Sequence, residues 1–207
     1  MMDKIISKQE QVSMTPESVL KDLLEGNQRF VKNNLEHRDY NLLKTSTSDG
    51  QYPKAIVLSC VDSRVPVETV FDQSIGDIFV SRVAGNFVNI DILGSMEFAC
   101  KVAGSKLVFV LGHEKCGAVS SACDHVKLGH ITAMLKNIEP AIEQTKTKGE
   151  RNSKNAEYVQ AVVEKNVMLN IERIRKESPI LKDLEDSGQI KIVGGVYSLK
   201  TGEIKML

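Results

Sequence analysis

The chain has 207 residues, of which 42% are hydrophobic and 26% charged, and its 27 basic side chains balance 27 acidic ones. This composition excludes a disordered or collagen-like chain and predicts one domain over residues 1–207. A zero formal net charge provides no field to attract nucleic acid or an anionic membrane, and no apolar run approaches the ~20 residues that span a bilayer. We therefore expect a small-molecule substrate, no nucleic-acid partner and no membrane partner.

The cysteines and the N-terminal residues bear on the compartment. Cys60, Cys100, Cys116 and Cys123 are four thiols in a chain large enough to fold without disulfides. The first residues mix charges and contain no apolar core of a signal peptide. We therefore expect reduced thiols and a cytoplasmic location.

The N-terminal third begins with a helix signal. Thr15-Pro16-Glu17 offers a capping hydroxyl, a proline at the first helical position and an acidic residue in the first turn. Leucines at helical spacing follow, which predicts a helical arm over residues 15–34. Residues 35–53 are mostly polar and end in Tyr52-Pro53, a pattern typical of an irregular connector.

Three continuous apolar runs predict strands buried on both faces, namely residues 55–58, 78–80 and 107–111. A helical stretch over 91–102 lies between the last two runs and stops at Gly104, where a C-terminal glycine belongs. Strand, helix and strand in this order predict a right-handed crossover and a parallel sheet.

The C-terminal half continues this alternation. Its expected elements are a helix over 130–145 kinked at Pro140, a loop over 145–154, an amphipathic helix over 159–174, a strand over 189–199 and an edge strand over 204–207. The predicted fold class is α/β. A mostly parallel central sheet carries flanking helices, the N-terminal helical arm and a C-terminal antiparallel edge strand.

Two predicted strands end in residues that can bind a metal. In open α/β sheets ligands bind beyond the carboxyl ends of the strands. One strand ends in Ser59-Cys60-Val61-Asp62, and another ends in Gly112-His113-Glu114-Lys115-Cys116. Two thiolates and one imidazole suit Zn²⁺ and leave a fourth position for water. We therefore expect one Zn²⁺ per chain in an α/β core over residues 54–207.

The other cysteines and histidines have simpler interpretations. Cys116 is expected to open a helix, whose positive end favours a thiolate. A lone cysteine at a strand end is usually a small hydrophobic residue, and Cys100 and Cys123 are interpreted in this way. His37, His125 and His130 lie in polar surroundings and are expected at the surface.

Several blocks resemble one known family. The resemblance covers roughly residues 15–207, and the blocks that carry it are Cys60-Val61-Asp62-Ser63-Arg64, Arg82-Val83-Ala84-Gly85-Asn86, Gly112-His113-Glu114-Lys115-Cys116-Gly117-Ala118, Leu24-Glu25-Gly26-Asn27-Gln28-Arg29-Phe30 and Gly195-Val196-Tyr197-Ser198-Leu199-Lys200-Thr201-Gly202. They resemble the signature blocks of the β-class carbonic anhydrases.

The resemblance implies an activity and a set of site residues. The activity is the reversible hydration of carbon dioxide to bicarbonate and a proton, by attack of a zinc-bound hydroxide. Cys60, His113 and Cys116 would bind Zn²⁺, and Asp62 and Arg64 would form the active-site pair. The family also implies a homodimer or homotetramer whose pockets are lined from both subunits. The arm before the polar connector is expected to reach away from its own domain onto a partner.

The same resemblance implies five substrate-binding residues. Gln51 matches a substrate-contacting glutamine, Phe79 matches an apolar pocket residue, and the Gly117 amide would receive substrate oxygens. Ala84 stands where valine is common, and Phe98 stands where plant-like members carry tyrosine. Val57 stands where one subgroup carries a tryptophan that holds inhibitory bicarbonate, so that inhibition is not expected.

Other interpretations remain open at this point. Asp62 is either the partner of Arg64 in an ordinary surface ion pair, a catalytic carboxylate, or a conditional fourth zinc ligand. The alternative functions are a hydrolase of carbonyl sulfide or carbon disulfide on the same scaffold and a non-catalytic zinc-binding module. A nucleotide-binding enzyme is disfavoured because no Gly-rich phosphate loop follows a predicted strand.

Overall fold

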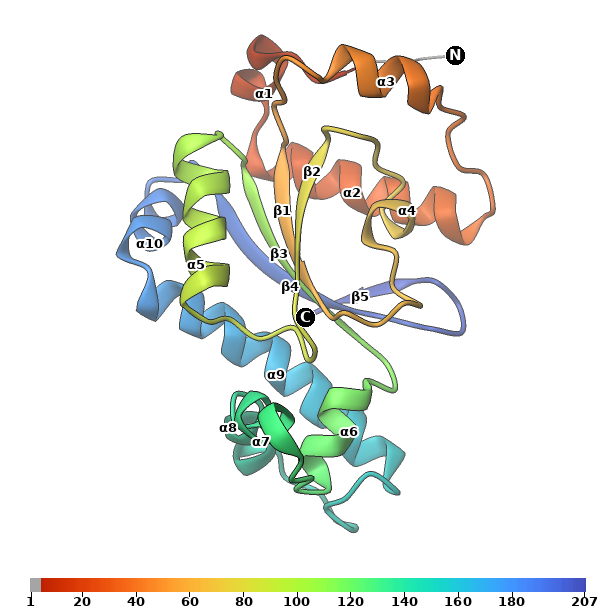
Figure 1. The fold of residues 1–207 in the computed structure, drawn as a ribbon, viewed down its shortest axis with the longest axis vertical. Coiled ribbons are helices and arrows are strands. Elements are labelled where there is room, and N and C mark those ends of the chain that lie inside the picture. The colour runs from red at the N-terminus through yellow and green to blue at the C-terminus, as the bar shows by residue number, and fades with distance from the viewer. Residues whose placement is uncertain (1–4) are drawn as a thin grey trace.

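A computed structural model describes residues 5–207, which form layers of helices around a central sheet (Figure 1). The strands are β1 (Ala55–Ser59), β2 (Ile78–Arg82), β3 (Leu107–His113), β4 (Lys191–Tyr197) and β5 (Ile204–Met206). Their order is β2-β1-β3-β4-β5, with parallel pairing throughout except between β4 and β5, which are antiparallel. The predicted α/β class and the antiparallel edge strand are confirmed.

Helices cover both faces of the sheet (Figure 1). One face carries α5 (Ile90–Glu97), α9 (Ala156–Glu177) and α10 (Pro179–Asp186), and the other carries α2 (Pro16–Val31) and α4 (Val67–Val70). The helices α6 (Gly117–Cys123), α7 (Gly129–Leu135) and α8 (Glu139–Gln144) gather beyond the carboxyl ends of the strands, whereas α1 (Lys8–Ser13) and α3 (Tyr40–Ser46) lie near the opposite ends.

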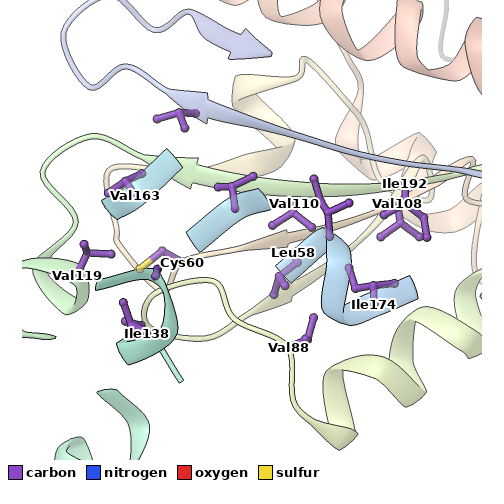
Figure 2. Close-up of a cluster of buried hydrophobic side chains, with 14 of the residues drawn as sticks. Leu58, Cys60, Val88, Val108, Val110, Val119, Ile138, Val163, Ile174 and Ile192 are labelled. Atoms are coloured by element: carbon purple, nitrogen blue, oxygen red, sulfur yellow. The ribbon is translucent and has the colours of Figure 1, made fainter. Parts of the chain in front are cut away.

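The continuous apolar runs supply two cores at once, because successive strand residues point to opposite faces. In β1, Ile56 and Leu58 join the larger core under α9, while Ala55 and Val57 join the core under α2. The alternation places Cys60, the residue after β1, on the larger-core side (Figure 2). Strand β2 differs from its prediction: it is only half-buried, because it is the edge strand of the sheet.

The N-terminal arm packs on its own sheet. Helix α2 begins as predicted, with the Thr15 hydroxyl accepting a hydrogen bond from the Ser18 backbone N–H. Its apolar residues Val19 and Leu23 are fully buried in the second core. The expectation that this helix reaches away from its domain was therefore wrong, because its apolar residues pack against the sheet of the same chain.

A buried amide joins this first long helix to the last strand. Asn27 Nδ2 donates to the backbone carbonyls of Val70, at 3.1 Å, and Gly202, at 2.8 Å. Its Oδ1 accepts from the Ile204 backbone N–H at 3.1 Å. Asn27 thus holds the turn between β4 and β5 against α2.

Other expectations need correction. Residues 35–53 are not wholly irregular, since they contain α3, which begins where the Asp39 side chain accepts from two backbone N–H groups and buries only Leu43. The helix expected over 130–145 is two helices, because Pro140 occupies the first turn of α8, where its missing N–H costs no hydrogen bond. Helices α1, α4 and α10 were not predicted either.

The helix expected over 91–102 is present in two parts. Helix α5 continues into a π-helical turn, Phe98–Val102, and the chain leaves it through Gly104, whose φ is +85°. Among residues 5–207 no helix is long and apolar enough to cross a membrane.

The contact between α2 and the segment after α4 generates a prediction. A Cβ on Gly26 would lie 1.9 Å from the Phe71 carbonyl oxygen, a backbone atom that cannot move aside cheaply. Gly26→Ala should lower the free energy of unfolding by about 1–3 kcal/mol, as other overpacked sites do. The neighbouring exposed change Glu25→Ala should stay within ~0.5 kcal/mol. Chemical denaturation of both variants measures this, and equal midpoints would contradict the close packing.

Candidate metal centre

The strand ends bring three ligand atoms together. Ser59 of β1 pairs with Leu111 of β3, so Cys60 and His113 leave the sheet at adjacent points of one edge. Cys116 follows three residues after His113. The two sulfurs and a ring nitrogen of His113 lie within 4.8 Å of one another, and all three residues are buried.

Cys60 lies among apolar side chains of the larger core (Figure 2). Its sulfur is 3.9 Å from the Cys116 sulfur and accepts a hydrogen bond from the Gly85 backbone N–H at 3.3 Å. The hydrogen bond from Cys116 lowers the pKa of Cys60 more than burial raises it, and the Gly85 backbone N–H lowers it further. One thiol of this pair therefore ionises readily.

Cys116 is the N-terminal cap of α6, so the expected helix start is confirmed. Its hydrogen bond to Cys60 and its burial raise the pKa of Cys116, and the backbone N–H groups of Val119 and Ala118 offset only part of that rise. Two neighbouring buried sulfurs thus hold one negative charge readily but not two. A divalent cation compensates the second charge, and thiolates are preferred zinc ligands.

His113 presents a nitrogen that no protein group satisfies. Its Nδ1 lies 2.9 Å from the Glu114 carbonyl oxygen, and since a carbonyl only accepts, Nδ1 carries the proton. In the neutral ring Nε2 then has a free lone pair. This Nε2 is buried without a hydrogen-bond partner among residues 5–207. An orphaned acceptor beside two sulfurs fits a zinc ligand whose tautomer is fixed by a backbone carbonyl.

The carboxylate of Asp62 lies beside the cluster and is held by Arg64. The guanidinium donates to both carboxylate oxygens, at 3.0 and 2.8 Å, and the Arg64 backbone N–H adds a bond of 2.9 Å. These bonds hold the pKa of Asp62 well below its usual range, against the opposing effect of burial. Asp62 Oδ2 is 3.9 Å from His113 Nε2. An ionised acceptor therefore faces the candidate ligands.

Arg82 and Glu114 form hydrogen bonds that hold the segments around the site. Neither residue was assigned a role from the sequence. Arg82 donates to the carbonyl of Cys60 at 2.9 Å and to that of Asp62 at 2.6 Å. The Glu114 carboxylate accepts from the Ser198 hydroxyl and the Leu199 backbone N–H. Both residues occur in the sequence blocks that signalled the site, but nothing in those blocks identifies their backbone partners.

The expected substrate-binding residues do not all converge within one chain. Ala84 precedes Gly85 beside the cluster, and Gly117 opens α6 with its backbone exposed. Phe79 and Phe98 contact each other with ring centroids 6.3 Å apart, and both line a hollow over the outer side of β2 and α5. Gln51 precedes β1, at the opposite end of that strand from Cys60.

The remaining cysteines and histidines lie where they were expected. Burial raises the pKa of Cys100 to about 12 and that of Cys123 to about 11, so both thiols stay protonated at neutral pH. Neither belongs to the cluster of possible ligands. The three histidines assigned to the surface, His37, His125 and His130, are exposed.

Known proteins share both this sequence pattern and this fold. A family model described as carbonic anhydrase matches residues 55–204. The chain is 33% identical over 193 residues to carbonic anhydrase 2 of Mycobacterium tuberculosis, covering 90% of each chain, and 32% identical to a carbonic anhydrase of Mycolicibacterium smegmatis, covering 92% of this chain and 93% of the relative.

Solved structures agree in fold. A Coccomyxa β-carbonic anhydrase in complex with acetazolamide superposes with a TM-score of 0.71 at 22% identity, covering 91% of this chain and 86% of that one. One of two tetrameric β-carbonic anhydrases from Sordaria macrospora gives 0.70 at 21% identity, covering 81% and 86%. These relatives do not favour the alternative of a carbonyl sulfide or carbon disulfide hydrolase, or that of a non-catalytic module.

Metal content tests the ligand set. We expect one Zn²⁺ per chain in the purified protein and loss of zinc in Cys60→Ser and Cys116→Ser, because a hydroxyl replaces a thiolate ligand. Cys100→Ala serves as the matched control and should retain zinc. Elemental analysis after gel filtration measures all four proteins, and full zinc occupancy in Cys60→Ser would remove Cys60 from the site.

Proposed function

Because this chain belongs to the β-carbonic anhydrase family, we propose that it catalyses the reversible hydration of carbon dioxide to bicarbonate and a proton. In this proposal Cys60, His113 and Cys116 hold one Zn²⁺, and Asp62 and Arg64 act on the reacting groups. The observation that carries it is the buried cluster of two sulfurs and an unpartnered imidazole nitrogen at the carboxyl edge of the sheet.

The reaction needs a strong nucleophile next to a small apolar substrate. Zinc supplies the nucleophile by lowering the pKa of water, which is ~15.7 in bulk, towards ~7. Asp62, ionised and held at both oxygens by Arg64, accepts a hydrogen bond from the nucleophile and directs its lone pair at carbon. The exposed backbone N–H of Gly117 receives a developing bicarbonate oxygen.

Asp62 has a second role in the proposal. Its Oδ2 is 3.9 Å from His113 Nε2, so a carboxylate released by Arg64 would be available as a fourth metal ligand. Arg64 therefore acts as the group that keeps Asp62 off the metal. The balance between these two positions of Asp62 sets the fraction of active protein.

A second subunit completes the pocket in this proposal. Gln51, Phe79 and Phe98 lie away from the cluster of their own chain, and both aromatic rings face the outer side of the edge strand β2. A two-fold axis beside β2 brings such residues to the partner's cluster, because both copies then exchange the same surface. The homodimer is the minimal unit, and the homotetramer is a further assembly of it.

The proposed location is the cytoplasm. The structure records all four cysteines as free and buried, as suits a protein kept in a reducing compartment.

Replacing Arg64 tests the role of the pair. Arg64→Ala should bind zinc nearly normally yet lose about 10–100-fold in CO₂ hydration, as loss of an orienting partner does. Without Arg64 the pKa of Asp62 returns towards ~3.9, so Asp62 stays ionised at neutral pH. An Asp62 carboxylate released onto the metal would compete with hydroxide, so the loss should be larger at neutral than at alkaline pH, while activity rises with pH in both proteins.

Stopped-flow hydration assays over that pH range measure the effect. Arg173→Ala is the control, because Arg173 also pairs with a carboxylate but lies on the exposed side of α9. Wild-type turnover in Arg64→Ala would make the Asp62–Arg64 pair an ordinary structural ion pair.

Subunit mixing tests the shared pocket. Gln51→Ala and Asp62→Ala should each be nearly inactive as homodimers. After the two proteins are unfolded and refolded together, each mixed dimer contains one site with both defects and one intact site. Activity should recover to about a quarter of the wild-type value, given random pairing in a two-fold dimer. No recovery, with mixed dimers detected by mass spectrometry, would place Gln51 and Asp62 in the same subunit's pocket.

A further inference from the structure

Helix α9 carries two buried asparagines on the side that faces the metal centre. Asn166 is 2% exposed and Asn170 is 1% exposed. They are four residues apart and therefore share one face of the helix, the face that also buries Val163 and Val167. Buried amides at such positions require hydrogen-bond partners, and the partners of these two lie in residues 85–88.

The hydrogen bonds fix both amides in one orientation. Asn170 Nδ2 donates to the Asn166 backbone carbonyl at 2.8 Å and to Asn166 Oδ1 at 3.1 Å. Since that Oδ1 accepts, the Nδ2 of Asn166 is the atom that donates to the Gly85 carbonyl, at 2.9 Å. Asn170 Oδ1 accepts from the Val88 backbone N–H at 2.8 Å. Asn166 and Asn170 thus form hydrogen bonds with both ends of the segment 85–88.

This segment has an unusual backbone and a direct contact with the metal centre. Gly85 and Asn86 are both left-handed, with φ of +86° and +41°. A Cβ on Gly85 would lie 2.6 Å from Ile138 Cδ1, so a larger residue there would strain the left-handed backbone and displace that side chain. The Gly85 N–H donates to the Cys60 sulfur at 3.3 Å. The direction of the Gly85 N–H depends on the left-handed backbone of Gly85 and Asn86, a conformation that the residues of this segment do not favour by themselves.

We propose that Asn166 and Asn170 are positioning residues of the metal centre, which hold residues 85–88 so that the Gly85 N–H stays on the Cys60 sulfur. The inference rests on the proposed function in that Cys60 is taken to hold zinc. An N–H aimed at a ligating sulfur stabilises its negative charge and fixes its lone pairs. Loss of the hydrogen bonds with the two asparagines should therefore weaken zinc binding although all three ligand residues are still present.

The sharpest variant is Asn166→Asp. It keeps the size of the side chain and an oxygen for Asn170 to donate to, but it replaces the donor to Gly85 by an acceptor. We expect zinc to be held about 10–100-fold more weakly in competition with a chromophoric chelator, as for other outer contacts of metal ligands. In the cobalt-loaded protein the thiolate-to-metal absorption should move to lower energy, because a sulfur that has lost its hydrogen bond is easier to oxidise.

Two further variants serve as controls. Asn170→Asp introduces the same charge one turn along the helix but keeps an acceptor for the Val88 N–H, so its zinc loss should be smaller. Ile174→Ala removes a fully buried side chain from the same helix and lowers stability without removing a hydrogen bond to residues 85–88. It should retain zinc and the wild-type cobalt spectrum. Thermal unfolding of each zinc-free protein measures the stability change separately.

The outcomes separate this inference from the proposed function. Weaker zinc and a moved cobalt band in Asn166→Asp, with neither change in Ile174→Ala at an equal or larger loss of stability, support the inference. The inference is overturned if Asn166→Asp retains zinc as firmly as the wild-type protein, or if Ile174→Ala loses zinc to the same extent. In either case the proposed function still stands, provided that the wild-type protein binds zinc. If Asn166→Asp is not recovered folded, Asn166→Ala removes the donor to Gly85 without adding a charge and is compared with Ile174→Ala in the same way. A wild-type protein that binds no zinc overturns both.

Discussion

Two sulfurs and an imidazole nitrogen are buried within 4.8 Å of one another. The surrounding structure must hold these three atoms in place and compensate their charge. Two buried negative charges repel each other unless a cation lies between them, and the ring nitrogen must keep its lone pair free. The parallel register of β1 and β3 supplies the position, the Glu114 carbonyl supplies the tautomer, and backbone N–H groups point at both sulfurs. Each of these is a backbone feature, so the centre depends on the fold as a whole.

Much of the fold was predictable because its signals are local. The runs that became β1 and β3 are apolar on both faces, and Thr15-Pro16 marks the start of α2 without ambiguity. The metal-binding residues were predictable because they follow two strands that share an edge. Helix α3 was missed since it buries only Leu43, and the break at Pro140 was interpreted as a kink because proline allows both.

What the sequence left hidden depends on contacts distant along the chain. Asn166 and Asn170 interrupt an apolar stripe at a spacing of four residues, a signal that something polar lies opposite, but only the structure identifies residues 85–88 as that partner. The packing of α2 on its own sheet was likewise invisible, since an apolar stripe does not name the surface that covers it.

The bond from Asn27 to the β4–β5 turn has a consequence for how the chain assembles. A helix made early in synthesis holds a strand made much later, 177 residues along the chain for the Asn27 contact with Ile204. Contacts this distant form slowly, because a long loop must close before they stabilise anything. The face of the sheet under α2 can be covered early, but the contact between α2 and β5 forms only after β5 has left the ribosome. Until β5 has been made, β4 has no partner on one side and can pair with other chains. This exposure ends when the turn between β4 and β5 forms and β5 pairs with β4.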